Sequence, residues 1–390
     1  MDRLQKNFDL LLQDVSVEFH RYLYDRIDWK NRLIGLVGPR GVGKTTLVLQ
    51  YAREVWKRDE VLYVTADDLY FASNKLVDLA DEFVRMGGKM LIVDEIHKYK
   101  EWSRELKLIY DYYSKRLQVI FTGSSILDIV KGTSDLSRRA VMYRMQGLSF
   151  REYLQLFHHI TLPVYSLSQI LAHEVVLPQG FRPYVYFSDY LKNGYYPFGN
   201  EPQFDILLKQ VVQNTLEIDI PQFAEISLAT SRKLKQLLAI VSQSVPFKPN
   251  MSSIATMIGA GRNNLANYLI YMEEAGLIAQ LRNDTGGIRG LGKVDKVYLD
   301  NTNLIYALGH ENADIGNVRE TFFMNQTRVG HDVISSSVSD FQIVGLTFEV
   351  GGRNKKQKQL QGVENGYVVK DDIEKGHLNV IPLWMIGLLY

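Results

Sequence analysis

The chain has 390 residues, a length that suggests two or three domains. Hydrophobic residues make up 46% and charged residues 23%, and the formal net charge is +1, so the composition is that of a globular protein with no global attraction to nucleic acid or membranes. Without cysteine, it has no disulfides, thiolate metal sites or cysteine nucleophiles, and no apolar run reaches the length of a membrane span. We therefore expect a cytoplasmic protein with no membrane partner.

Apolar residues recur at helical spacing between Asn7 and Tyr24. This periodicity predicts an amphipathic helix ahead of the first strand. We expect it to serve packing rather than chemistry.

Residues 33–47 predict a buried strand, a glycine-rich turn and the start of a helix. The pattern Gly-x-x-x-x-Gly-Lys-Thr in this setting is that of a phosphate-binding P-loop. Its glycines let backbone N–H groups approach an anion, and the helix N-terminus favours the same phosphates. Lys44 is expected to reach the β- and γ-phosphates of ATP, and the Thr45 hydroxyl to hold Mg²⁺. The residues expected to bind the nucleotide are Gly38, Pro39, Arg40, Gly41, Val42, Gly43, Lys44, Thr45 and Thr46.

Two further strands are predicted, at residues 61–65 and 90–93, and the strand–helix–strand spacing predicts parallel connections. Asp94 and Glu95 follow the second of these, at the end of the strand where open α/β sheets bind ligands. Asp94 is expected to bind Mg²⁺ directly or through water, as the Walker B aspartate. Glu95 is expected to orient and deprotonate the attacking water.

Residues 119–121 predict another strand, which ends in the polar run 122–125. In P-loop ATPases of the additional-strand type, such a strand lies between the P-loop and Walker B strands, and a polar residue at its tip senses the γ-phosphate. Thr122 and Ser124 both fit; Ser124 is preferred, with a helix N-cap as the alternative. The run 74–78 resembles a guanine-specificity motif, but its aspartate is one position late and it precedes the Walker B strand, so ATP is favoured over GTP.

The segments GPRGVGKTTL, LIVDEIHK, FTGSS, LSRR and GLSFREYL follow one another in this order, and the later runs DYLKNGYYP, KVYLD and FEVGGRNK continue the series. This series resembles a family of prokaryotic AAA-type ATPases. Members carry a downstream domain of uncharacterised function with remnants of a nuclease-like fold. The resemblance covers nearly the whole chain.

In that family the run after the sensor strand usually reads Leu-Ser-Gly-Arg. The present chain keeps the arginine as Arg139 and replaces the glycine by Arg138. A guanidinium near the γ-phosphate would stabilise charge in phosphoryl transfer. The resemblance implies this role for Arg139; Arg138 and a merely exposed basic loop are the alternatives.

Residues 151–290 are mostly helical in pattern, and 250–285 give two helices, a Gly-Ala-Gly turn and a strand, which is typical of a winged helix-turn-helix. The second helix should face outward with a set of polar side chains able to contact bases or phosphates. Such folds in AAA-type proteins also serve as lids or protein-docking modules, so DNA and protein partners both stay open. The outward-facing set is Arg262, Asn263, Asn264 and Asn267.

Residues 291–390 predict an α+β domain of nuclease-like type. Glu320, Asp340 and Glu349 could be the acidic residues of such a core, but the expected Glu-x-Lys is missing and Lys355 is only a substitute. A basic run near Lys355 could bind phosphates, although such runs usually form solvated surface. We expect this domain to be inactive.

The predicted fold class is therefore α/β: an AAA-type P-loop domain with a parallel sheet at 1–150, a helical and winged-helix region at 151–290, and an α+β domain at 291–390. The predicted function is Mg²⁺-dependent hydrolysis of ATP to ADP and phosphate, used as a conformational switch on the C-terminal domains, with oligomer formation possible. The alternative is a nucleotide-regulated DNA- or protein-binding regulator with little turnover. A Mg²⁺-dependent nuclease is the third hypothesis.

Overall fold

The computed structural model describes residues 1–113, 115–123, 136, 138–224, 226–243, 250–284, 292–309 and 313–390. They form two compact units. One comprises Met1–Gly147 and Gln222–Ala224, and the other comprises Leu148–Pro221 and Glu225–Tyr390. A further division near residue 290 stays a prediction.

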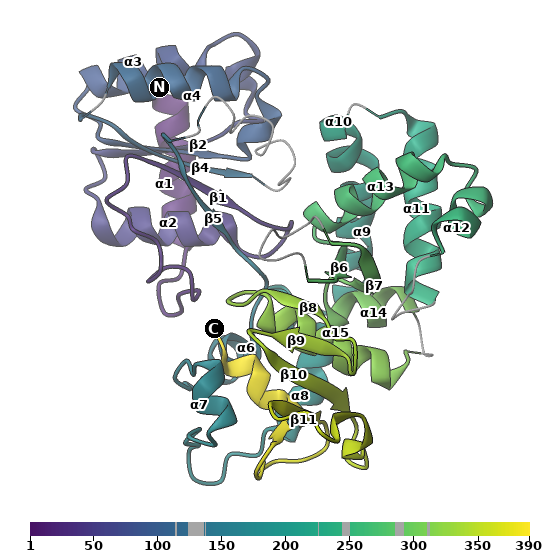
Figure 1. Ribbon diagram of the computed structural model, residues 1–390. Helices are drawn as coiled ribbons and strands as arrows, with labels where there is room; N and C mark the ends of the chain where they lie inside the picture. Colours follow the sequence, from purple (N-terminus) through teal and green to yellow (C-terminus); the bar gives the residue numbers. More distant parts are fainter. Residues whose placement is uncertain are drawn as a thin grey trace. The chain divides into compact units, whose positions relative to one another are not determined.

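The first unit is built on a five-stranded sheet in the order β2-β3-β4-β1-β5, with all neighbouring strands parallel (Figure 1). The α/β class and the additional strand are confirmed, because β4 lies between β1 and β3. Strands β1 and β3 are buried along their whole length, as expected of a parallel sheet covered by helices. The strands are β1 (Leu33–Val37), β2 (Val61–Thr65), β3 (Met90–Asp94), β4 (Gln118–Gly123) and β5 (Val141–Arg144).

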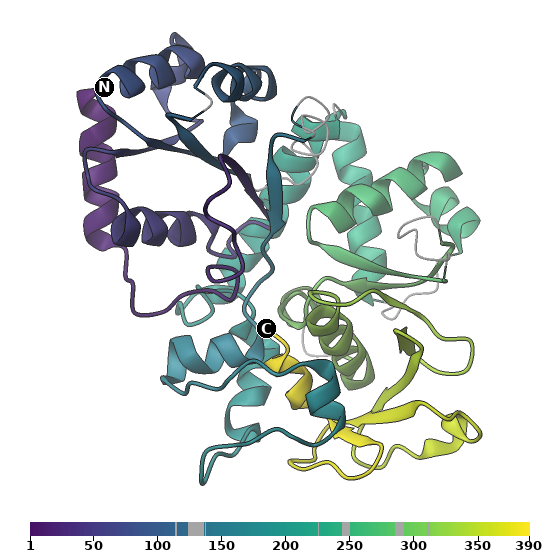
Figure 2. The ribbon, with the colours of Figure 1, turned by 60° about the vertical axis from the view of Figure 1, so that its left-hand side comes forward.

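Helices cover both faces of this sheet. Figure 1 shows α3 and α4 on one face and α2 on the other. Figure 2 shows α1 running alongside one edge of the sheet, and α1 packs against the edge strand β2. The helices are α1 (Asp2–Asp14), α2 (Lys44–Val55), α3 (Leu76–Arg85) and α4 (Trp102–Tyr112), with short 3₁₀ turns η1 (Leu69–Ala72) and η2 (Ile96–Lys98).

The first helix is displaced from its predicted position, because α1 begins at Asp2 and ends at Asp14 rather than spanning 7–24. Side chains of α2 satisfy the backbone carbonyls that follow. Arg53 donates to the Val15 carbonyl, and Gln50 donates to the Ser16 and Phe19 carbonyls at 2.7 and 2.8 Å. These tertiary hydrogen bonds replace the helical ones, so the periodic pattern continues without a helix.

The second unit combines helices with two sheets, in agreement with the predicted helical and α+β regions. The larger sheet has the order β12-β11-β10-β9-β8; β8, β9 and β10 are antiparallel neighbours, whereas β10, β11 and β12 are parallel. The smaller is an antiparallel pair of β6 and β7. The strands are β6 (Ile278–Arg282), β7 (Val294–Leu299), β8 (Val333–Ser335), β9 (Phe341–Ile343), β10 (Leu346–Gly351), β11 (Gly366–Lys370) and β12 (Val380–Pro382).

Helix α15 packs against β10 of the larger sheet. The α-helices of this part of the chain are α6 (Phe150–His158), α7 (Leu167–Leu171), α8 (Tyr184–Asp189), α9 (Phe204–Asn214), α10 (Ile220–Ala224), α11 (Leu228–Gln243), α12 (Met251–Met257), α13 (Arg262–Glu274), α14 (Thr302–Gly309) and α15 (Ile315–Thr327). Among the described residues there are also the π-helical turns η3 (Tyr190–Gly194) and η4 (Thr215–Asp219) and the 3₁₀ turns η6 (Gln357–Leu360) and η7 (Leu383–Leu388).

The run DYLKNGYYP forms a structural junction at the π-turn η3. A π-turn leaves backbone groups without their usual helical partners, and the fully buried Asn303 satisfies three of them. Its amide nitrogen donates to the carbonyls of Tyr190 and Leu191 at 3.1 and 3.0 Å, and its oxygen accepts from the Tyr195 N–H at 2.9 Å. The ring of Tyr190 also packs edge-on against Phe322 of α15. This signature run therefore has a structural explanation.

Candidate nucleotide-binding site

The P-loop connects the end of β1 at Val37 to the start of α2 at Lys44. Gly41 and Gly43 have φ of 82° and 95°, a region that glycine adopts without steric cost. Gly38 is required for a different reason: a Cβ there would lie 2.2 Å from the Met145 carbonyl oxygen. The loop thus has the close backbone approach that phosphate binding needs.

Lys44 is 5% exposed and is the first residue of α2. Its Nζ lies 2.9 Å from the Gly38 carbonyl oxygen and 2.8 Å from that of Pro39. The ammonium is therefore held inside the loop, at the positive end of the helix dipole. The expected contact of Lys44 with the β- and γ-phosphates of ATP stays a prediction.

Thr45 and Asp94 come together from two motifs 49 residues apart. The Thr45 hydroxyl donates to Asp94 Oδ2 at 2.7 Å, and Asp94 is 4% exposed at the end of β3. A hydroxyl and a carboxylate are hard oxygen ligands of the kind that Mg²⁺ prefers. The residues present therefore fit a Mg²⁺ ion bound next to the P-loop.

Two residues that sequence reasoning did not assign hold the Asp94 carboxylate. The Tyr63 hydroxyl of β2 donates to Asp94 Oδ2 at 2.7 Å. The fully buried Thr122 of β4 donates to Asp94 Oδ1 and accepts the Glu95 N–H at 3.2 Å. The sequence offers Thr122 as one of two candidate sensors, whereas Tyr63 lies in an apolar run that indicates only a strand. Tyr63 reaches the site because it is paired with Ile92 of β3. Burial, followed by the Asp94 charge, raises the pKa of Tyr63, so its hydroxyl stays a donor.

Glu95 follows Asp94 with φ of 51°, a left-handed conformation that is rare for a residue with a side chain and is found at functional sites. Its side chain is 26% exposed, and Oε2 lies 3.4 Å from Nε2 of His97. Burial first, and then the positive charges of Lys98, Lys44 and Arg40, lowers the pKa of His97 to about 3. A neutral imidazole therefore stands beside the carboxylate expected to activate water.

The structure does not bring Arg139 to Lys44 within one chain. Strand β5 runs parallel to β1 with Arg144 opposite Val37, and Arg139 precedes β5. Arg139 therefore lies towards the end of the strands opposite to the P-loop. There its Nε lies 3.0 Å from Asp111 Oδ1, near the end of α4. Ser124 lies outside the described residues, so its sensor role stays a prediction.

The three candidate acidic residues of the C-terminal part, Glu320, Asp340 and Glu349, are paired with lysines. Lys296 Nζ of β7 lies 3.2 Å from Glu320 Oε2 and 3.4 Å from Asp340 Oδ1. Burial alone lowers the pKa of Lys296, but the two carboxylates outweigh it and the pKa is raised. Glu349 is paired with Lys355. The ammonium groups thus already compensate the carboxylates that a nuclease would use for a metal.

The predicted winged-helix region contains α12 and α13 packed together, followed by the antiparallel pair of β6 and β7. Leu265, Tyr268 and Leu269 form the buried face of α13. All four residues predicted to point outward are exposed: Arg262, Asn263, Asn264 and Asn267.

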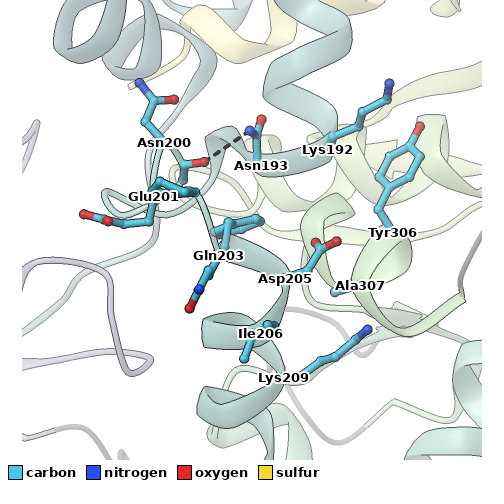
Figure 3. Close-up of a pocket in the computed structure, with 13 residues that line it drawn as sticks. Lys192, Asn193, Asn200, Glu201, Gln203, Asp205, Ile206, Lys209, Tyr306 and Ala307 are labelled. Carbon is cyan, nitrogen blue, oxygen red and sulfur yellow. Dashed lines mark hydrogen bonds between the residues drawn. The ribbon is translucent and has the colours of Figure 1, made fainter.

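A groove of about 870 Å³ lies beside η3 and α9 in the second unit (Figure 3). Figure 3 shows that its labelled side chains come from residues 192–209 and from Tyr306 and Ala307 of α14. Lys192 and Lys209 are balanced by Glu201 and Asp205, so the lining favours neither sign of charge.

In the part of the chain that the structure describes, no helix combines the length and apolar character needed to cross a membrane. Among the same residues, no three or more His, Asp or Glu side chains are grouped so that they could hold a metal ion.

Comparisons with known proteins agree with this arrangement of motifs. Residues 30–154 match the family model of the AAA domain, and residues 186–315 match that of a domain of unknown function (DUF8612). A comparison with curated proteins gives no match.

The solved structures that match the chain include two from other proteins. One is PCH-2 of C. elegans, with 17% identity and a TM-score of 0.27, covering 70% of this chain and 66% of that one, just under two thirds. The other is from a study of katanin self-assembly, with 17% identity and a TM-score of 0.26, covering 48% of this chain and 67% of that one. TM-scores this low do not establish a shared fold. The family models and the sheet order identify the chain as one that carries an AAA domain of the P-loop class, followed by a domain of unknown function.

Proposed function

We propose that the protein is a Mg²⁺-dependent ATPase that hydrolyses ATP to ADP and phosphate as a conformational switch on its C-terminal part. One observation carries the proposal. The Thr45 hydroxyl and the Asp94 carboxylate lie 2.7 Å apart at the carboxyl ends of the strands, where the P-loop and Glu95 also lie. The absence of cysteine from the sequence fits a reducing cytoplasm as the location.

The roles of the residues follow from their positions. The loop N–H groups and Lys44 bind the phosphates, and Thr45 and Asp94 hold Mg²⁺. The ion, when bound, neutralises charge on the β- and γ-phosphate oxygens. Glu95 orients a water molecule and accepts its proton as the water oxygen attacks the γ-phosphorus and the bond to the ADP oxygen breaks.

Arg139 enters this proposal as a group supplied to the site of a second copy of the chain. It stands at the opposite end of the strands from its own P-loop, so its guanidinium would act in trans, as arginine fingers do in other P-loop enzymes. Mixing Arg139→Ala with Lys44→Ala protein tests this. Activity should reappear in the mixture, because each variant keeps the part that the other lacks; inactivity of both variants alone and of the mixture contradicts the role.

The proposed hydrolysis is tested by steady-state turnover of wild type, Lys44→Ala and Glu95→Gln, with binding measured separately. Lys44→Ala should lose ATP binding. Glu95→Gln should bind ATP but turn over at least about 100-fold more slowly, the smaller end of the range for a general base. Glu101→Gln is the matched control, because this carboxylate is exposed and only six residues away. Equal turnover by all four proteins refutes the proposal.

A second candidate function is nucleotide-regulated binding of DNA through α13, with slow or incidental turnover. The specific observation is the exposed face with Arg262 and Asn264. If DNA is bound there, affinity should respond to ATP, fall steeply with salt, and drop in Arg262→Ala and Asn264→Ala. Unchanged binding by these variants would leave a protein partner as the alternative.

A further inference from the structure

One buried arginine outside every nucleotide-binding motif contacts the P-loop. Arg21 lies between α1 and β1 and is 5% exposed. Its Nη1 donates to the carbonyl oxygen of Val42, in the middle of the loop. Its Nη2 donates to the carbonyls of Gln146 and Gly147 at 2.7 and 2.8 Å. All of these residues belong to the Met1–Gly147 part of the first unit.

Residues 144–147, called the exit segment here, lead from the end of β5 to Gly147, the last residue of the Met1–Gly147 part of the first unit. They lie directly against the start of the P-loop, because the Met145 N–H donates to the Val37 carbonyl at 2.7 Å and the Met145 oxygen leaves no room for a side chain at Gly38. Tyr22 adds a second tie: its hydroxyl lies 3.3 Å from both the Arg144 oxygen and the Gln146 nitrogen.

The contact with Val42 has a direct consequence for phosphate binding. The Val42 carbonyl and the Gly43 N–H belong to one planar trans peptide, so they point in opposite directions. A guanidinium that fixes the carbonyl therefore also fixes the N–H that the loop offers to a phosphate. The planar guanidinium presents several donors in a rigid fork, and its charge strengthens each hydrogen bond. If the Val42–Gly43 peptide moves, Arg21 must move with it, and its hydrogen bonds to the carbonyls of the exit segment must change.

We propose that Arg21 is a positioning residue that orients the Val42–Gly43 peptide for phosphate binding and couples that peptide to the exit segment. The proposal rests on the proposed nucleotide-binding function, and it names the physical link by which the nucleotide affects the chain beyond Gly147. The occupant that drives the change is a nucleoside di- or triphosphate, recognised by its phosphates.

The experiment uses the full-length protein and does not depend on turnover. ADP affinity is measured by calorimetry, and backbone hydrogen exchange of residues 144–147 is followed with and without ADP and Mg²⁺. In the wild type, ADP should slow exchange in this segment. Arg21→Met keeps the side-chain stem but removes the donors, so it should weaken ADP binding about tenfold and abolish the exchange response. Arg21→Lys should recover part of both effects.

Two further variants separate positioning from folding. Arg53→Met is the matched control: it removes a guanidinium that also binds backbone carbonyls, those of Leu12 and Val15, and should leave both readouts unchanged. Tyr22→Phe provides a second test if Arg21→Met does not fold. It should speed hydrogen exchange at the Gln146 amide, while its ADP affinity stays within about twofold of the wild-type value. An unchanged ADP affinity in Arg21→Met, or a wild-type exit segment that ignores bound ADP, overturns the inference. Failure of wild type to bind any nucleotide overturns the proposed function instead.

Discussion

Removing the Tyr63 hydroxyl by Tyr63→Phe should destabilise the first unit through Asp94. The hydroxyl is a 2.7 Å donor to a carboxylate that is 4% exposed, so water cannot replace it without rearrangement. Hydrogen bonds to charged groups contribute about 1.5–3 kcal/mol to stability. The ring itself stays in place, since it stacks against Phe8 with a centroid distance of 6.1 Å, and the substitution leaves no cavity there.

Thermal unfolding of the nucleotide-free protein measures this effect. At roughly 2–4 °C per kcal/mol for a unit of this size, the transition of the first unit should fall by roughly 3–12 °C. Thr122→Val removes the donor to the other carboxylate oxygen, and the double variant should show coupling because both hydroxyls act on one charge. Tyr112→Phe, at a tyrosine that is 65% exposed, is the control. Equal transitions for Tyr63→Phe and Tyr112→Phe would refute the reasoning.

Three other predictions concern buried polar groups. The pKa of His97 is about 3 in the folded protein, below its ordinary value of 6.5, so the unfolded chain binds the proton first as the pH falls. The free energy of unfolding should therefore decrease as the pH drops from 6.5 towards 3. In His97→Phe the melting temperature should depend less on pH in this range, and an unchanged dependence would argue against the prediction. Lys296→Met leaves the Glu320 and Asp340 carboxylates without the ammonium group between them and should lower the free energy of unfolding by about 3–5 kcal/mol. Adding Glu320→Gln should restore part of this loss in thermal unfolding. A double variant no more stable than Lys296→Met contradicts the prediction. Asn303→Ala leaves three buried backbone groups at η3 without their hydrogen-bond partner and should lower the free energy of unfolding by about 3 kcal/mol or more. Hydrogen exchange at the Tyr195 amide should become faster. Continued protection of this amide would show that the π-turn does not depend on Asn303.

The candidate acidic residues of the C-terminal part show what the sequence can predict and what it cannot. The sequence identifies Glu320, Asp340 and Glu349 as candidate acidic residues and notes that a lysine is missing at the expected spacing. It does not reveal that Lys296, which is 24 and 44 residues away from the first two, inserts between them. Such a charge cluster depends on the tertiary structure, because Lys296 of β7 reaches Glu320 of α15 and Asp340, the residue before β9, only when these three segments lie together.

The sequence by itself determined the elements whose conformation is local. The P-loop, the start of α2 and the acidic end of β3 follow from glycines, apolar runs and a lysine within a few residues of one another, because φ preferences and helix start signals act over that range. Only the tertiary structure decided which distant side chains serve them. Strand order places Tyr63 and Thr122 on Asp94 and puts Arg139 at the far end of the sheet, and the close packing of β5 on β1 lets Arg21 bind the loop and the exit segment together. The pairing of parallel strands depends on contacts between segments far apart in the chain, and no local pattern encodes such contacts.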